Sequence, residues 1–90
     1  MLHHVTLRHT AESCPGRPGN EHVIPCVQKL DDVLRDKGIR VVARYADPPG
    51  HVNFYVVDAE NAHAIVDAIM ESGLVAHTTS EIRAVLSMDG

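Results

Sequence analysis

The fold is decided by the first stretch of the chain, residues 2–19, which reads LHHVTLRHTAESCPGRPG. Residues 3–10 alternate between apolar and polar side chains, with Val5 and Leu7 on the apolar side. This period of two is typical of a β-strand with one buried face. Residues 11–19 contain a cysteine and two Pro-Gly pairs, so they predict a loop.

Two amphipathic helices are expected downstream of this loop. Asn20 is a residue type that caps helices, and apolar side chains then recur every three or four positions. Pro25 fits only within a first turn, so the regular helix is expected to begin at Ile24 or Pro25. Asp58 is expected to cap a second helix, and a glycine follows each apolar stripe as a stop signal.

Three further strands are expected, at residues 39–45, 51–57 and 77–86. In residues 51–57, Val52, Phe54 and Val56 form the more apolar face, which we expect to contact the helices. The whole chain, residues 1–90, then forms one domain with the order β-α-β-β-α-β. This order predicts a ferredoxin-like α+β fold, a four-stranded antiparallel sheet with two helices on one face. Right-handed crossovers place the strands in the order 4-1-3-2.

The other face of this sheet is expected to carry polar side chains suited to a small anion. Guanidinium groups bind carboxylates or phosphates through paired hydrogen bonds. The expected ligand-binding residues are Arg8, Arg44, Asn53, Tyr55, Glu81 and Arg83. Cross-strand salt bridges on a solvated face, such as Arg8 with Glu81, are the alternative interpretation.

The predicted topology also gathers four histidines and both cysteines at one end of the sheet. The candidate metal ligands are His9, Cys14, His51 and His77, with His22 and Cys26 as further candidates. Imidazole and thiolate groups suit a transition metal such as zinc, copper, nickel or iron. No pair has the spacing of a known metal motif, so solvated loop histidines are the alternative.

Cys14 is also a candidate nucleophile, because a helix start lowers the pKa of a nearby thiol. In that interpretation the catalytic residues are Cys14, His51 as a proton carrier and Arg8 as an anion-binding group. Cys26, beside Val27, is expected to be a structural thiol.

Composition excludes several classes of protein. The formal net charge of −4 does not fit a general nucleic-acid binder. No run of eighteen apolar residues is present, so no membrane span is expected, and two cysteines do not make a disulfide scaffold. Histidine and arginine interrupt the first residues, which lack a signal core, so a cytoplasmic location is expected.

Residues 8–15, RHTAESCP, resemble the HTPE-x-CP start of a group of short prokaryotic proteins, with Ala11 in place of the proline. This group is placed in the dimeric α+β barrel superfamily, which includes muconolactone isomerases and antibiotic-biosynthesis monooxygenases. The resemblance implies a homodimer whose open sheet faces turn inward around a small-molecule ligand.

The expected function is therefore the binding of a small anionic or metal-linked ligand. Its site is expected at the end of the sheet where the first strand leads to the first helix, and on the adjoining open face. A small cofactor-independent enzyme of the isomerase, decarboxylase or monooxygenase type is one alternative. A regulatory or assembly module without a site is the other.

Overall fold

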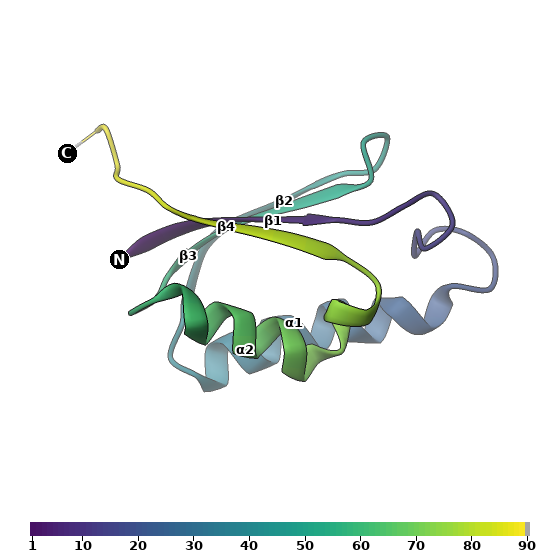
Figure 1. Cartoon of the computed structure of the whole chain (residues 1–90), viewed down its shortest axis with the longest axis horizontal. Helices are drawn as coiled ribbons and strands as arrows, with labels where there is room; N and C mark the ends of the chain where they lie inside the picture. The colour runs from purple at the N-terminus through teal and green to yellow at the C-terminus, as the bar shows by residue number, and fades with distance from the viewer. Residues whose placement is uncertain (90) are drawn as a thin grey trace.

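The computed structural model describes residues 1–89 and has the expected ferredoxin-like α+β plan (Figure 1). Its elements are β1 (Leu2–Arg8), η1 (Glu21–Val23), α1 (Ile24–Asp36), β2 (Arg40–Asp47), β3 (Val52–Asp58), α2 (Ala62–Ser72), η2 (Leu74–Ala76) and β4 (Thr79–Ala84). Within these residues the strands form one four-stranded antiparallel sheet in the order β2-β3-β1-β4. This is the predicted order 4-1-3-2, counted from the other edge. Helices α1 and α2 cover one face, and the loop after β1 lies at the same end as the β2–β3 turn (Figure 1).

The core lies between the sheet and the two helices. Val5 of the central strand β1 pairs with Tyr55 on β3 and Ile82 on β4, so these side chains share the helix-facing side. The largest fully buried side chains are Leu7, Leu30, Leu34, Val57 and Ile65. All of them except Val57 come from the predicted apolar positions of β1 and of both helices.

The side-chain alternation of β3 is the reverse of the expected one. Because Tyr55 lies opposite Val5, it faces the helices and is 5% exposed, and Val57 is fully buried beside it. Phe54 and Val56 face the open side instead, opposite residues of β1 that alternate out of the core. The prediction failed because β3 has apolar or aromatic side chains on both faces, so its period carried little information.

A bulge changes the alternation of β2 as well. The pairing of β2 with β3 shifts between Val41 and Ala43, which inserts one extra residue. Beyond the bulge, Arg44 lies opposite Tyr55 on the helix side and Tyr45 lies on the open side. An inserted residue exchanges the two faces of the strand that follows it. The expected open-face positions of Arg44, Asn53 and Tyr55 are therefore wrong.

The helix starts confirm one prediction and correct two. Helix α1 begins at Ile24 with Pro25 in its first turn, as predicted. Helix α2 is capped by Asn61, whose Oδ1 accepts a hydrogen bond of 3.0 Å from the Ala64 amide. Asp58 lies in β3 and binds the terminal ammonium group at 2.7 Å, which lowers the pKa of this carboxyl. Asn20 makes no side-chain cap either.

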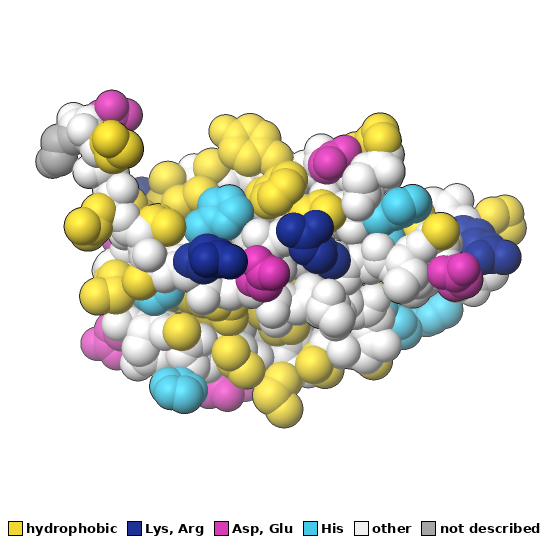
Figure 2. Space-filling view, turned by 45° about the horizontal axis from the view of Figure 1, so that its top comes forward, with side chains coloured by type: hydrophobic (Ala, Val, Ile, Leu, Met, Phe, Trp, Pro, Cys, Tyr) yellow, Lys and Arg dark blue, Asp and Glu magenta, His cyan; other side chains and the backbone are white. Residues whose placement is uncertain are grey.

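The open face of the sheet is mixed in character (Figure 2). Pairing places on this face the residues His4, Thr6, Arg8, Ala43, Tyr45, Val52, Phe54, Val56, Thr79, Glu81 and Arg83. Hydrophobic side chains gather on one part of it beside a row of charged ones (Figure 2). Over the described part of the chain, neither helix is long and apolar enough to cross a membrane.

Candidate metal centre

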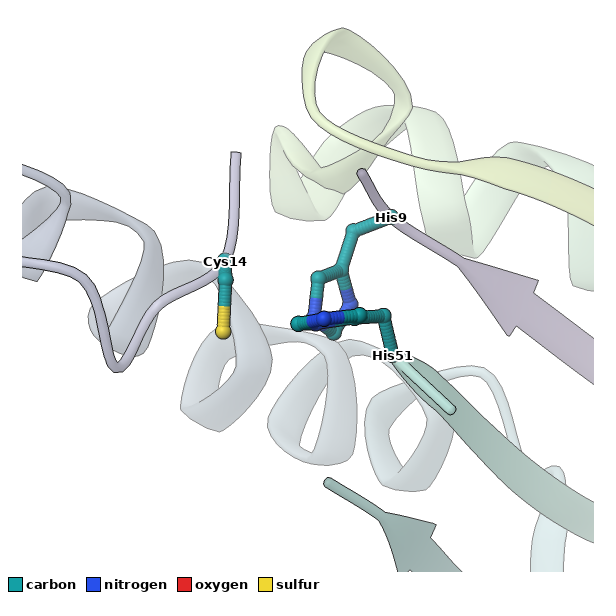
Figure 3. Close-up of side chains that lie close together, drawn as sticks. All are labelled: His9, Cys14 and His51. Atoms are coloured by element: carbon teal, nitrogen blue, oxygen red, sulfur yellow. The ribbon is translucent and has the colours of Figure 1, made fainter. Parts of the chain in front are cut away.

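Three side chains from separate segments converge at the end of the sheet where β1 leads into its loop. His9 follows β1, Cys14 lies in the loop, and His51 precedes β3. One imidazole nitrogen from each histidine and the Cys14 sulfur all lie within 4.8 Å of one another, and the side chains point toward a common centre (Figure 3). His51 Nδ1 lies 3.3 Å from His9 Nε2, and the two ring planes are 78° apart.

The β2–β3 turn holds His51 in an uncommon backbone conformation. Its φ of 56° is left-handed, which few non-glycine residues adopt. The His51 amide donates to the Pro48 carbonyl at 3.2 Å, and the Gly50 amide donates to Asp47 Oδ1 at 3.0 Å. The Asp47 carboxylate lies close to Gly50, where a Cβ would displace it and disturb this hydrogen bond. The His9 amide donates to the His51 carbonyl at 3.0 Å, which joins the two histidine backbones.

Asn20 holds the loop segment that carries Cys14. Its Nδ2 donates to the Glu12 carbonyl at 2.6 Å and to the Cys14 carbonyl at 3.1 Å. The Arg17 amide also donates to the Cys14 carbonyl, at 3.0 Å. Sequence reasoning assigned Asn20 to helix capping, because the same side chain caps helices and closes loops equally well. Only the fold shows which backbone groups lie within its reach.

The electrostatics of the site favour a neutral His9. Partial burial, followed by the charge of the neighbouring His51, lowers the pKa of the His9 imidazole. A neutral imidazole is the form that binds metal ions. Cys14 is a free thiol of intermediate burial, and Cys14, His9 and His51 form a donor set of two nitrogens and one sulfur. This set suits borderline and soft transition-metal ions, with coordination positions left over for other ligands.

His77, the fourth predicted metal ligand, is not part of this group. Its ring packs against that of His22, with ring centroids 5.2 Å apart. Cys26 is partly buried against the hydrophobic core, and its thiol lies 3.8 Å from the His22 carbonyl. The sequence-based prediction that these residues lie at one end of the sheet was sound, but the fold divides them into two groups.

The sheet separates the predicted anion-binding residues. Arg8, Glu81 and Arg83 lie on the open face as expected, and Arg83 pairs with Glu81 at 3.4 Å where both side chains are exposed. Arg8 and Asn53, both expected on the open face, lie on opposite faces of the sheet, because Asn53 pairs with Leu7 and faces the helices. Exposed ion pairs of this kind contribute little to stability.

The remaining predicted ligand-binding residues line a cavity on the helix side. Arg44, Asn53 and Tyr55 surround a space of about 280 Å³ next to α1. Asp31 of α1 binds Arg44 and accepts a hydrogen bond from the Tyr55 hydroxyl at 3.4 Å. Burial, and then the Asp31 charge, raise the pKa of Tyr55 to about 12. Because Asp31 already neutralises Arg44, this cavity has less attraction for an anion than a free guanidinium would give.

Comparison with known proteins identifies a similar fold but indicates no activity. No family model matches the chain, and no curated protein matches it. Among solved structures, the chain is similar to SCO4226 from Streptomyces coelicolor A3(2), with a TM-score of 0.64 and 20% sequence identity. The match covers 94% of this chain and 98% of that one. The two chains share a fold.

Proposed function

We propose that the protein binds a transition-metal ion through His9, Cys14 and His51. The observation that carries the proposal is the convergence of three donor atoms within 4.8 Å, from segments separated by as many as 42 positions in the chain. Several loop hydrogen bonds and a left-handed residue maintain this convergence. Such conformations cluster at functional sites.

The spacing of the donors suits a tetrahedral ion. With metal–nitrogen distances of about 2.0–2.1 Å, two nitrogens on a tetrahedron lie about 3.3 Å apart. His9 Nε2 and His51 Nδ1 are 3.3 Å apart. A nitrogen and a sulfur would lie about 3.6 Å apart, so Cys14, whose sulfur is within 4.8 Å of both nitrogens, would need to move by at most about 1.2 Å.

A three-ligand site leaves a fourth position for water or a small ligand. On one side of His9, a cavity of about 310 Å³ is lined by Arg8, Thr10, Ser13 and Thr79, among others. A guanidinium and several hydroxyls beside an open metal position would suit a small anion. This arrangement supports a metal-linked anionic ligand.

In this proposal Cys14 is a metal ligand. The alternative is a small enzyme that acts through the same open coordination position.

Metal titration of purified, untagged protein tests the proposal. Wild-type protein is expected to bind one tight equivalent of Zn²⁺ or Co²⁺, and Co²⁺ should give a thiolate charge-transfer absorption band. Cys14→Ser should abolish the band and the tight equivalent. His51→Asn removes the imidazole but tolerates a left-handed backbone, so its loss of binding would reflect the ligand and not strain.

Two matched variants serve as controls. Cys26→Ser removes the other thiol, and His63→Asn removes an exposed histidine on α2. Both should bind the tight equivalent as wild type does. If Cys14→Ser and His51→Asn bind as tightly as these controls, the proposed site is wrong.

We also propose that two copies associate through their open sheet faces. Tyr45 is 68% exposed on this face, and it lies opposite the partly buried Phe54, next to Val56. An exposed aromatic residue on an apolar patch is typical of an interaction surface. Light scattering should give the mass of a dimer, and Tyr45→Lys should shift it to that of a monomer. A wild-type protein that stays monomeric at all concentrations would contradict this arrangement.

A further inference from the structure

A second pair of histidines lies at the same end of the molecule. His22 belongs to η1, and His77 follows η2. Their ring centroids are 5.2 Å apart with the ring planes at 66°. This geometry is close to that of His9 and His51, whose centroids are 5.1 Å apart at 78°. We propose that His22 and His77 bind a second transition-metal ion.

Both histidines are anchored by buried neighbours. Val23, directly after His22, is 3% exposed, and Leu74, at the start of the turn that leads to His77, is 2% exposed. The His77 amide donates to the Leu74 carbonyl at 2.9 Å. The backbones that carry the two rings are therefore held by the core, so the rings meet at low entropic cost.

The two imidazoles are available as ligands. Among the hydrogen bonds and ion pairs of residues 1–89, none uses a ring nitrogen of His22 or His77, whereas the ring of His3 is paired with the Met1 carbonyl. Two imidazole rings in edge-to-face contact, one of them exposed, can each present a nitrogen to one ion. Water would complete the coordination.

Cys26 does not complete a second set of two histidines and a cysteine. Its sulfur packs near Gly73 and lies by the His22 carbonyl, on the side of the core. The second site therefore has two nitrogen donors and no thiolate. Such a site suits Zn²⁺, Cu²⁺ or Ni²⁺, and it should bind more weakly than a site with two histidines and a thiolate.

One histidine of each site lines a common cavity. His9 and His77 both line the space of about 310 Å³ that opens where β1 and β4 separate, beyond the last paired residues, Arg8 and Thr79. Figure 2 shows histidine side chains gathered at the end of the molecule where this loop region lies. The second site therefore lies next to the first.

Zn²⁺ titration by calorimetry, on the full chain, tests the second site. The wild-type protein should bind a second, weaker equivalent, and His22→Asn or His77→Asn should weaken that equivalent by about a hundredfold or more, since losing even a residue that only orients a ligand costs about 10–100-fold. In both variants the tight equivalent should remain. Cys14→Ser should show the opposite pattern, with the weak equivalent retained.

Two further readouts complete the test. His63→Asn is the matched control and should keep both equivalents. In wild-type protein, the second equivalent of Zn²⁺ should shift the imidazole NMR resonances of His22 and His77. This measurement does not depend on whether a variant folds. The inference is overturned if the wild type binds no second equivalent, if His22→Asn and His77→Asn bind it unchanged, or if those resonances do not respond. Loss of the tight equivalent alone would count against the first site and leave the second standing.

Discussion

Replacing Asn20 by alanine should weaken metal binding without removing a ligand. The Asn20 side chain donates to the carbonyls of Glu12 and Cys14, at 2.6 and 3.1 Å, and so holds the loop that presents the thiol. Without it, the loop is free to adopt conformations in which Cys14 is distant from the two histidines. The expected effect is a lower metal affinity at nearly unchanged global stability, because the loop lies outside the core.

The magnitude follows from the two hydrogen bonds. A neutral hydrogen bond contributes a net of about 0.5–1.5 kcal/mol, and the bond to Glu12 is exposed. Together the two bonds should favour the closed loop by about 1–2 kcal/mol. Affinity falls in proportion to the population of the competent loop conformation. Since about 1.4 kcal/mol is a factor of ten, the dissociation constant should rise about 5- to 30-fold.

Competition for Zn²⁺ with a chromophoric chelator measures this change, and thermal unfolding of the metal-free protein measures stability. Asn61→Ala is the matched control, because the Asn61 side chain also bonds to the backbone, accepting from the Ala64 amide, but caps α2. That variant should lose about 1 kcal/mol of stability and keep the wild-type affinity. The reasoning is refuted if Asn20→Ala keeps the wild-type affinity, or if the two variants cannot be distinguished.

Three other changes test the core and the titrating groups. Leu34→Ala, at a side chain 2% exposed, should lower the free energy of unfolding by about 2–5 kcal/mol in urea; a loss below about 1 kcal/mol would mean that the core is not packed as described. Burial and His51 lower the pKa of His9, so an NMR titration of the metal-free protein should place its midpoint below the ordinary 6.5. The native state then binds fewer protons than the unfolded chain, so this histidine makes stability fall as the pH drops through 6.5, and a higher midpoint would contradict the described burial. Tyr55 keeps its proton up to about pH 12, so its contribution to stability should be complete below about pH 10 and be lost as the pH rises from there toward 12. Tyr55→Phe should remove that loss, and urea unfolding at pH 9 and pH 11 compares the two proteins.

The order of elements could be predicted because each boundary has a local chemical cause. Residues 4–8 alternate between polar and apolar side chains, Pro25 restricts the start of α1, and a glycine in the left-handed conformation ends α2. These signals involve only a few neighbouring residues, so each can be recognised without knowing how the rest of the chain folds. Once the order was known, the handedness of the connections determined the arrangement of the strands.

The faces of β2 and β3 could not be predicted, because their cause is not local. Phe54 and Tyr55 are both aromatic, and only the pairing of Tyr55 with Val5 determines which of them enters the core. In β2, a bulge between Val41 and Ala43 reverses the alternation, and the sequence there shows no glycine or proline to mark it. A shift of one residue moves every side chain to the other face.

The amino-acid sequence alone was sufficient for the fold class and for the expectation that histidines and cysteines collect at one end. Both follow from periodicity and chain direction, which are properties of neighbouring residues. Only the tertiary structure separated those residues into a group of His9, Cys14 and His51 and a pair of His22 and His77. Donor atoms must lie within a few ångströms to share an ion, and that distance depends on turns, loop hydrogen bonds and strand register acting together.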